Sequence, residues 1–129
     1  MTTVEVPYSI AAALPSLSVM DITNDVAKSV ASSECREGIA YVHAVPAATV
    51  VRIQERETGI FEDLEILFDR IVPGGTPLRE RILSTLLGPR TEAVPVREGC
   101  LCLGTYQRVL LFSLDVEHRA EWNLTVLGA

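Results

Sequence analysis

The stretch from Gly99 to Asp115 constrains the fold of this chain more than any other segment does. Between Val109 and Leu114 every residue except Ser113 is apolar, and such a run is typical of a strand buried on both faces. A tight turn at Glu98-Gly99 connects it to an upstream strand at Ala93–Arg97. We therefore expect one long strand over residues 99–115, at the centre of an antiparallel meander.

The segment that follows, residues 119–127, alternates between polar and apolar residues and predicts a strand with one buried face. Three further strands are expected upstream, at residues 3–10, 38–45 and 49–54. The predicted buried face of the last strand consists of Ala120, Trp122, Leu124 and Val126.

Three helices are expected between these strands. The longest spans residues 58–71, where apolar residues recur at helical spacing, and Pro73-Gly74-Gly75 ends it. Thr23 is expected to cap a short first helix, and Thr76-Pro77 to begin a third helix whose buried face is Leu78, Ile82 and Leu86. This order favours a single α+β domain over residues 1–129, a mainly antiparallel β-sandwich with helices packed at one side.

The composition narrows the classes of partner and compartment. A chain of 129 residues with 48% hydrophobic residues can bury a substantial core and is far from the composition of disordered proteins. Its net charge of −6 argues against nucleic acid or an anionic membrane as the main partner. The N-terminus has no basic signal-peptide region, no apolar run reaches membrane-spanning length, and three cysteines, an odd number, favour reduced thiols. We expect a cytoplasmic protein.

The least ordinary polar residues of the central strand are Thr105 and Gln107. A buried amide without a hydrogen-bond partner costs about 1–3 kcal/mol. The Gln107 amide must therefore be satisfied by the backbone, by a neighbouring subunit or by a ligand, and the sequence leaves all three open. Together with Arg119, these two residues form the best candidate binding set.

Other polar residues have simpler structural interpretations. His43 is predicted to be a hydrogen-bonded interior or interface histidine, since no second metal ligand lies near it in the sequence. Cys100 and Cys102 share one face of a strand and could form half of a zinc site, but small apolar packing in the core is favoured. Glu55, Glu57 and Asp63 lie around the start of the long helix, where carboxylates do acid–base work or simply complement the helix dipole. No metal site is predicted.

Several segments of the chain carry a family resemblance: Asp21-Ile-Thr-Asn-Asp-Val26, Gly38-Ile39 through to Glu55 and Asp63, Leu87-Gly-Pro89, Val94-Pro-Val96, Gly99 with Leu103-Gly-Thr-Tyr-Gln107, and Asp115 with Arg119. They resemble the YjbQ family, whose members are described as secondary thiamine-phosphate synthases. The family's usual aromatic residue before the glutamine is tryptophan, where this chain has Tyr106. The resemblance implies an α+β antiparallel sandwich that assembles as a homotrimer, with pockets near the subunit boundaries.

The chain departs from the family pattern at the family's histidines. Aligned on Glu55, the family's His-Thr-Thr-Ala block begins at Pro46, and its Ala-His pair ahead of Leu-Leu-Gly falls on Glu80-Arg81. A histidine-containing loop is longer in the family than Gly74-Gly75-Thr76 is here. The resemblance therefore implies a divergent member that lacks the family histidines. Without these histidines it has neither an evident group that titrates near neutral pH nor a three-ligand metal site.

Two functions are open on this basis. The favoured one is a homotrimer that binds a small anionic ligand through Arg81, Thr105, Gln107 and Arg119, or has a structural role, with no cofactor. Arg81 stands where the family has histidine, and a guanidinium there favours an anion. The alternative is a transferase of the thiamine-phosphate-synthase type, in which Glu55 and Asp63 are the catalytic carboxylates and Mg²⁺ is weakly held.

Overall fold

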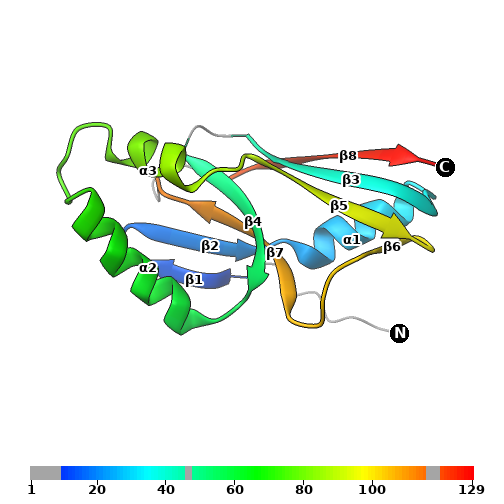
Figure 1. Cartoon of the computed structure of the whole chain (residues 1–129), viewed down its shortest axis with the longest axis horizontal. Coiled ribbons are helices and arrows are strands. Elements are labelled where there is room, and N and C mark those ends of the chain that lie inside the picture. Colours follow the sequence, from blue (N-terminus) through cyan, green and yellow to red (C-terminus); the bar gives the residue numbers. More distant parts are fainter. Residues whose placement is uncertain (1–9, 46–47, 116–119) are drawn as a thin grey trace.

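The computed structural model describes residues 10–45, 48–115 and 120–129, and Figure 1 shows how its elements are arranged. Within these residues two strands come first, followed by a helix, two strands, two helices and four strands. In chain order the elements are β1 (Ile10–Leu14), β2 (Leu17–Asp21), α1 (Thr23–Ser32), β3 (Glu37–Ala44), β4 (Thr49–Glu55), α2 (Thr58–Ile71), α3 (Arg79–Leu87), β5 (Thr91–Arg97), β6 (Cys100–Leu101), β7 (Gln107–Ser113) and β8 (Trp122–Gly128).

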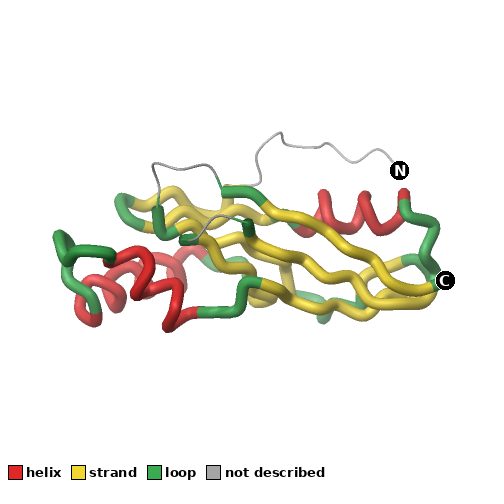
Figure 2. Tube along the Cα trace, turned by 90° about the horizontal axis from the view of Figure 1, so that it is seen from above, coloured by secondary structure: helices red, strands yellow, loops and turns green. Residues whose placement is uncertain are grey.

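The strands form two four-stranded antiparallel sheets, which confirms the predicted α+β sandwich. The first sheet has the strand order β1-β2-β7-β4, and the second has the order β6-β5-β3-β8. Figure 2 shows α1 at one end of the sandwich and α2 and α3 at the other. Among the described residues, no helix is long and apolar enough to cross a membrane.

Strand β7 runs through the middle of the first sheet and is buried on both faces, as its sequence predicted. Leu110 and Phe112 belong to a cluster of buried side chains with α2 and α3, whereas Val109 and Leu111 belong to a second cluster with α1 and the second sheet. Alternate residues of the strand therefore enter two different cores, and this explains the continuous apolar run.

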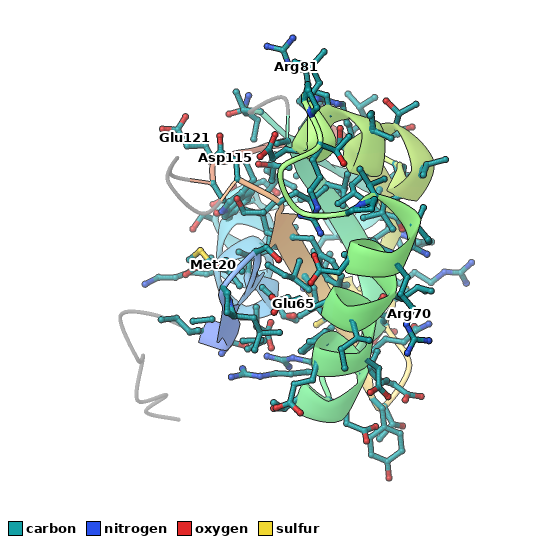
Figure 3. All side chains as sticks on the ribbon, turned by 90° about the vertical axis from the view of Figure 1, so that its left-hand side faces the viewer. Met20, Glu65, Arg70, Arg81, Asp115 and Glu121 are labelled. Carbon is teal, nitrogen blue, oxygen red and sulfur yellow. The ribbon has the colours of Figure 1, made fainter. Side chains whose placement is uncertain are left out.

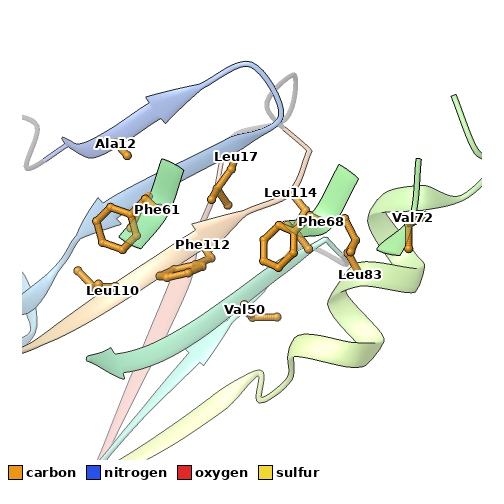
Figure 4. Packing of buried hydrophobic residues seen from close by; sticks show 11 residues of the cluster. Ala12, Leu17, Val50, Phe61, Phe68, Val72, Leu83, Leu110, Phe112 and Leu114 are labelled. Carbon is orange, nitrogen blue, oxygen red and sulfur yellow. The ribbon is translucent and has the colours of Figure 1, made fainter. Parts of the chain in front are cut away.

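Helix α2 covers the first sheet with aromatic side chains that its periodicity predicted to be buried. Phe61 and Phe68 pack among the strand residues (Figure 4). Phe61 meets Phe112 of β7 edge to face, with ring centroids 5.8 Å apart and ring planes at 89°. This is a favoured geometry for aromatic pairs, so it fixes the helix on the sheet as well as burying apolar area.

The N-terminal part of the first sheet contains a hairpin that the sequence analysis missed. Most of the strand predicted at residues 3–10 lies outside the described residues. From Ile10 onward the chain forms the β1–β2 hairpin around Pro15-Ser16. The run Ala11–Leu14 has no polar alternation, so its pattern gave no strand signal.

The single long strand expected over residues 99–115 is two strands, and that expectation is wrong. β6 ends at Leu101 in the second sheet, and β7 begins at Gln107 in the first. Between them the backbone N–H of Gln107 donates to the Gly104 carbonyl oxygen at 3.1 Å, which closes a turn at Thr105-Tyr106. The chain crosses from one sheet to the other at this turn.

The cysteines of this region are exposed, so the prediction that they pack in the core is also wrong. Cys100 and Cys102 both face solvent. Leu101 and Leu103 pack instead against the buried cluster between the sheets, and these alternate positions leave the two thiols on the opposite side.

Helix α3 begins later than predicted. Its first residue is Arg79, and the preceding Leu78 has a left-handed backbone conformation with φ 61°. The Thr76 hydroxyl donates to the Pro73 carbonyl oxygen at 2.6 Å and does not cap the helix. The predicted start at Thr76-Pro77 therefore belongs to the turn between the two helices.

The face that α3 turns toward the core is also different from the predicted one. Arg79 is buried, and it donates from Nε to the Val72 carbonyl oxygen at 2.8 Å and from Nη2 to Asp69 Oδ1 at 2.9 Å. Together with Leu83, one turn further on, it occupies the inward positions. As a result the three predicted core residues are exposed: Leu78 by 61%, Ile82 by 41% and Leu86 by 64%.

Candidate functional site

A pocket of about 390 Å³ opens where β4 ends and β7 begins. Figure 1 shows that this end of β4 lies away from α3, which is near the start of the same strand. The volume is in the range of pockets that bind small molecules. The lining residues come from the end of β4, from the loop after it and from the turn before β7; they are Glu55, Arg56, Glu57, Thr105, Tyr106 and Arg108.

The antiparallel pairing of β4 with β7 brings these residues together. Glu55, the last residue of β4, pairs with Gln107, the first residue of β7. The Thr105-Tyr106 turn therefore comes beside the residues that leave β4. Tyr106 is 76% exposed, so its ring is available to a ligand on this side of the molecule.

The two arginines that line the pocket are held by one buried carboxylate, that of Asp21. Its side chain is 0% exposed, and its Oδ2 accepts hydrogen bonds from Arg108 Nε at 2.8 Å and from Arg56 Nη1 at 3.2 Å. The side chains of Arg108 and Arg56 are 34% and 39% exposed. Asp21 thus orients two guanidinium groups that also reach the pocket.

The other carboxylate oxygen of Asp21 is held by Thr23. Oδ1 accepts the Thr23 backbone N–H at 3.0 Å and the Thr23 hydroxyl at 2.6 Å. The same hydroxyl oxygen accepts the backbone N–H of Val109 at 2.8 Å and so ties the start of α1 to β7. Ile22, not Thr23, stands at the N-cap, and the prediction of Thr23 as the cap is wrong because its hydroxyl serves Asp21.

The ionisation of Asp21 follows from these contacts. Burial raises the pKa of its carboxyl, but the hydrogen bonds from Arg108 and Thr23 lower the pKa by more, and the result lies below the ordinary value of 3.8. Asp21 is therefore ionised at neutral pH. With two guanidinium groups around one carboxylate, the Asp21–Arg56–Arg108 cluster as a whole is positively charged.

The pocket offers donors of the kind that bind oxyanions. Arg108 uses only Nε for Asp21, and a planar guanidinium binds carboxylate or phosphate oxygens with its remaining N–H groups. Thr105 and Tyr106 add hydroxyl groups to the lining, and hydroxyl groups can donate to an oxyanion. The carboxylates of Glu55 and Glu57 stand in the same lining and repel groups that carry only negative charge. A small ligand with one oxyanion group and further polar groups fits this combination.

Four of the residues considered from the sequence lie in or beside this pocket. Glu55, Glu57 and Thr105 line it, and Gln107 pairs with Glu55. The side-chain oxygen of Gln107 accepts the backbone N–H of Gly104 at 2.7 Å. The sequence left three kinds of partner open for the Gln107 amide. The structure shows that the backbone satisfies the amide oxygen.

The remaining predicted residues are elsewhere. Arg81 is on α3, and Figure 3 shows it at the end of the molecule that also carries Asp115 and Glu121. Asp63 is on α2 and does not line the pocket. Arg119 lies outside the described residues. Within one copy of the described chain, Arg81 and Thr105 are therefore not part of the same pocket.

The sequence analysis missed Asp21, Arg56 and Arg108 as site residues. A signal for Asp21 was present, because it continues the inward alternation of Leu17 and Val19 in β2. A carboxylate at such a position needs cationic or hydrogen-bonding partners. Which arginines supply them could not be read locally, since they are 35 and 87 residues away in the chain.

The described residues contain no group of three or more histidine, cysteine, aspartate and glutamate side chains that could hold a metal ion. His43 is exposed on the outer side of the second sheet, where its Nδ1 is 2.7 Å from Thr91 Oγ1. The predicted hydrogen bond is present, but the interior position is wrong. Of the two positions predicted for His43, the interior is excluded by its exposure, and a position in an interface stays a prediction.

Comparison with known proteins places this fold in a family. The family described as UPF0047 protein YjbQ-like matches residues 13–129. A UPF0047 protein of Archaeoglobus fulgidus is 33% identical over 106 residues, which cover 75% of this chain and 81% of that protein. A UPF0047 protein of Methanothermobacter thermautotrophicus is 27% identical over 119 residues, which cover 85% of this chain and 82% of that protein.

Solved structures agree with this assignment. A hypothetical protein from Aeropyrum pernix superposes with a TM-score of 0.80 at 26% identity, covering 90% of this chain and 92% of that one. A YbjQ-like protein of unknown function from Sulfolobus solfataricus gives a TM-score of 0.80 at 25% identity, covering 95% and 94%. From the match over residues 13–129, this chain belongs to the UPF0047 family of YjbQ-like proteins.

Proposed function

We propose that this family member binds a small anionic ligand in the pocket between β4 and β7, and that it works as a homotrimer without histidine-based chemistry. The observation that carries the proposal is the pair of guanidinium groups anchored on Asp21 and reaching one pocket. Because Arg56 and Arg108 are oriented before a ligand arrives, binding costs less side-chain entropy. An oxyanion is the ligand that gains most from such a pair.

Glycerol 3-phosphate, which combines one phosphate group with hydroxyl groups, is a suitable probe of this pocket. We expect it to bind the wild-type protein, and Arg108→Gln to weaken binding about 10-fold or more, because a charged hydrogen bond contributes about 1.5–3 kcal/mol. Isothermal titration calorimetry at low ionic strength measures both dissociation constants. Circular dichroism checks that the variant is folded, since Arg108 also contacts Asp21.

Two arginines outside the pocket serve as comparisons in the same titration. Arg70 is an exposed residue of α2 (Figure 3), and Arg70→Gln is expected to bind glycerol 3-phosphate like the wild type. Arg81→Gln tests the predicted role of Arg81 on α3. A variant at Arg108 that binds as tightly as wild type, or an equal loss at Arg70, would reject the pocket as the binding site.

The absence of histidine chemistry in this proposal is supported by the pocket's own residues. None of the six side chains that line it is a histidine. His43 lies on the outer side of the second sheet and contacts Thr91. The arginines and carboxylates of the lining are suited to holding a charged ligand, and they are less suited than histidine to moving a proton near neutral pH.

The homotrimer is supported by the outer face of the second sheet. Alternate residues of β3, β5 and β8 point inward to the core, and the others are exposed on the opposite side. Apart from Glu37 and Arg97, which pair at one end of the sheet, these outward residues and the neighbouring Val45 form what we call the outer sheet face. The outer sheet face contains no aspartate, glutamate, lysine or arginine. The outer sheet face consists of Ile39, Tyr41, His43, Val45, Thr91, Ala93, Pro95, Asn123, Thr125 and Leu127.

Charged residues stand around this face rather than on it. Glu37 pairs with Arg97 at one end of the sheet, and Glu121 lies at the other end, where its carbonyl oxygen accepts the Val45 N–H. An uncharged centre with a charged rim is the usual anatomy of a contact between subunits. A sheet face that remained in water would be expected to carry charges across its middle.

A charge placed at the centre of the outer sheet face is expected to prevent assembly. Thr125 of β8 is exposed and pairs with Tyr41 of β3. We expect wild-type protein to elute as a trimer and Thr125→Arg as a monomer, because the contact would bury an unpaired guanidinium. Size-exclusion chromatography with light scattering gives the masses. Ser29→Arg, at an exposed position of α1, is the matched control and should remain trimeric.

The alternative, a transferase with two catalytic carboxylates and Mg²⁺, requires Glu55 and Asp63 to act on one ligand. Glu55 lines the pocket and Asp63 does not. The pocket does contain a second carboxylate, Glu57, but the oriented arginines are its dominant feature. Binding of an anion is therefore the function that the geometry favours.

A further inference from the structure

A trimer with three-fold symmetry needs two different contact surfaces on each subunit. In a closed ring of three, every interface joins one patch of a subunit to a different patch of the next, because only two-fold contacts are self-complementary. The outer sheet face supplies one of these surfaces. A second apolar surface, elsewhere on the same chain, must supply the other.

The exposed large apolar side chains of the described residues gather in two places. Three of them, Ile39, Val45 and Leu127, belong to the outer sheet face, and six lie on α2, on α3 or directly before α3. Outside these two places only Ile10 and Tyr106 are exposed to this degree within the described residues. The six on the helices are Ile66, Leu67, Ile71, Leu78, Ile82 and Leu86.

Three of the six form a continuous row, which we call the α3 row. Ile82 and Leu86 are four residues apart and therefore lie on one side of the helix, and Leu78, the residue before the helix, stands at its N-terminal end. Within its own subunit α3 buries only Arg79 and Leu83. A helix of this pattern normally turns its apolar row toward a core, and here that row faces solvent.

We infer that, in the homotrimer proposed above, on which this inference rests, the α3 row of one subunit packs against the outer sheet face of the next. The α3 row is apolar, the outer sheet face contains no aspartate, glutamate, lysine or arginine, and the described residues of the same subunit cover neither of them. Their sizes agree: the α3 row is about 12 Å long at 1.5 Å per residue. Three strands spaced about 4.8 Å apart present a face of similar width.

The charges beside the two surfaces are compatible with this contact. Arg81 is exposed next to Ile82 on α3. At the rim of the outer sheet face, the carboxylate of Glu121 lies at one end, and Glu37 lies beside Arg97 at the other. Arg81 can therefore pair with an acidic residue of the partner subunit at the edge of the contact, while the uncharged centre receives the leucine and isoleucine side chains.

Mixing two variants tests this inference directly. Thr125→Arg damages the outer sheet face and leaves the α3 row intact, whereas Ile82→Glu damages the α3 row and leaves the sheet face intact. Each variant alone is expected to be a monomer. A one-to-one mixture is expected to form a heterodimer and nothing larger, because only one intact pair of surfaces remains. Native mass spectrometry and light scattering distinguish these species.

The controls separate this inference from the homotrimer itself. Ile10→Glu changes an exposed isoleucine outside both surfaces and should leave the trimer intact. Leu86→Glu repeats the test of the α3 row at a more exposed position, and circular dichroism confirms that each variant is folded. If Ile82→Glu and Leu86→Glu stay trimeric, or the mixture stays monomeric, the inference is overturned while the homotrimer stands. A monomeric wild-type protein would reject both.

Discussion

Replacing Asp21 by alanine is expected to lower the free energy of unfolding by about 3 kcal/mol. The substitution removes a carboxylate that is fully buried and that accepts hydrogen bonds from Thr23, Arg56 and Arg108. Breaking a buried ion pair typically costs about 3–5 kcal/mol. Both arginine side chains are about a third exposed, so water solvates them in part, and the expected loss lies at the lower end. Urea unfolding followed by circular dichroism measures it.

Asp25 provides the matched control for this substitution. It is an exposed carboxylate in the first turn of α1, four residues after Asp21. Its interaction with the helix dipole is worth about 0.3–1 kcal/mol, so Asp25→Ala should lose no more than that. If Asp21→Ala were no less stable than Asp25→Ala, the carboxylate could not be the anchor of the two arginines.

Acid titration examines the same group in the wild-type protein. The pKa of Asp21 is lower in the folded protein than in the unfolded chain, so the unfolded state takes up this proton first as the pH falls. The stabilisation from Asp21 is therefore complete above its unfolded pKa of about 4, and it is lost as the pH falls through the folded pKa. We expect the difference in unfolding free energy between wild type and Asp21→Ala to shrink between about pH 5 and the acid limit of folding. A constant difference would contradict the lowered pKa.

The parts of the fold that depend on local pattern were predictable from the sequence. The apolar run in β7 indicated a strand buried on both faces, and its residues do enter both cores. The alternation in β8 placed Trp122, Leu124 and Val126 on one face, and these residues pack against the cluster between the sheets. In both cases the period of the side chains along one strand contains the information.

The parts that depend on distant contacts were not predictable. The apolar spacing around α3 predicted that Leu78, Ile82 and Leu86 face the core, but Arg79 occupies an inward position and its guanidinium donates hydrogen bonds to Val72 and Asp69. The residues of the candidate site also divide into those that local pattern predicts and those that depend on distant contacts. The sequence pattern indicates Glu55 and Thr105, whereas Arg108 is recognised as a site residue only from its hydrogen bond to a buried carboxylate 87 residues away in the chain.

Adding a methyl group at Gly38 is expected to lower the free energy of unfolding by about 2–3 kcal/mol, as in other overpacked sites. Gly38 of β3 pairs with Gly128 of β8. The two strands approach so closely there that a Cβ on Gly38 would overlap the Leu127 carbonyl oxygen and lie 2.9 Å from the Gly128 Cα. These are backbone atoms, so they cannot rotate aside, and the end of β8 must separate from β3. Urea unfolding of Gly38→Ala measures the loss.

Gly59 gives a control of opposite sign for the Gly38 prediction. It lies in α2, and a Cβ there would meet only Glu57 Oε1, at 3.9 Å. Alanine is favoured over glycine in a helix by about 0.5–1 kcal/mol, so Gly59→Ala should be slightly more stable than wild type. Hydrogen exchange locates the damage in Gly38→Ala: the Ala129 N–H, which donates to the Glu37 carbonyl oxygen at 3.0 Å, should lose protection, while β7 keeps its own. Unchanged protection at Ala129 would mean that the strands accommodate the methyl group without separating, and this result would contradict the prediction.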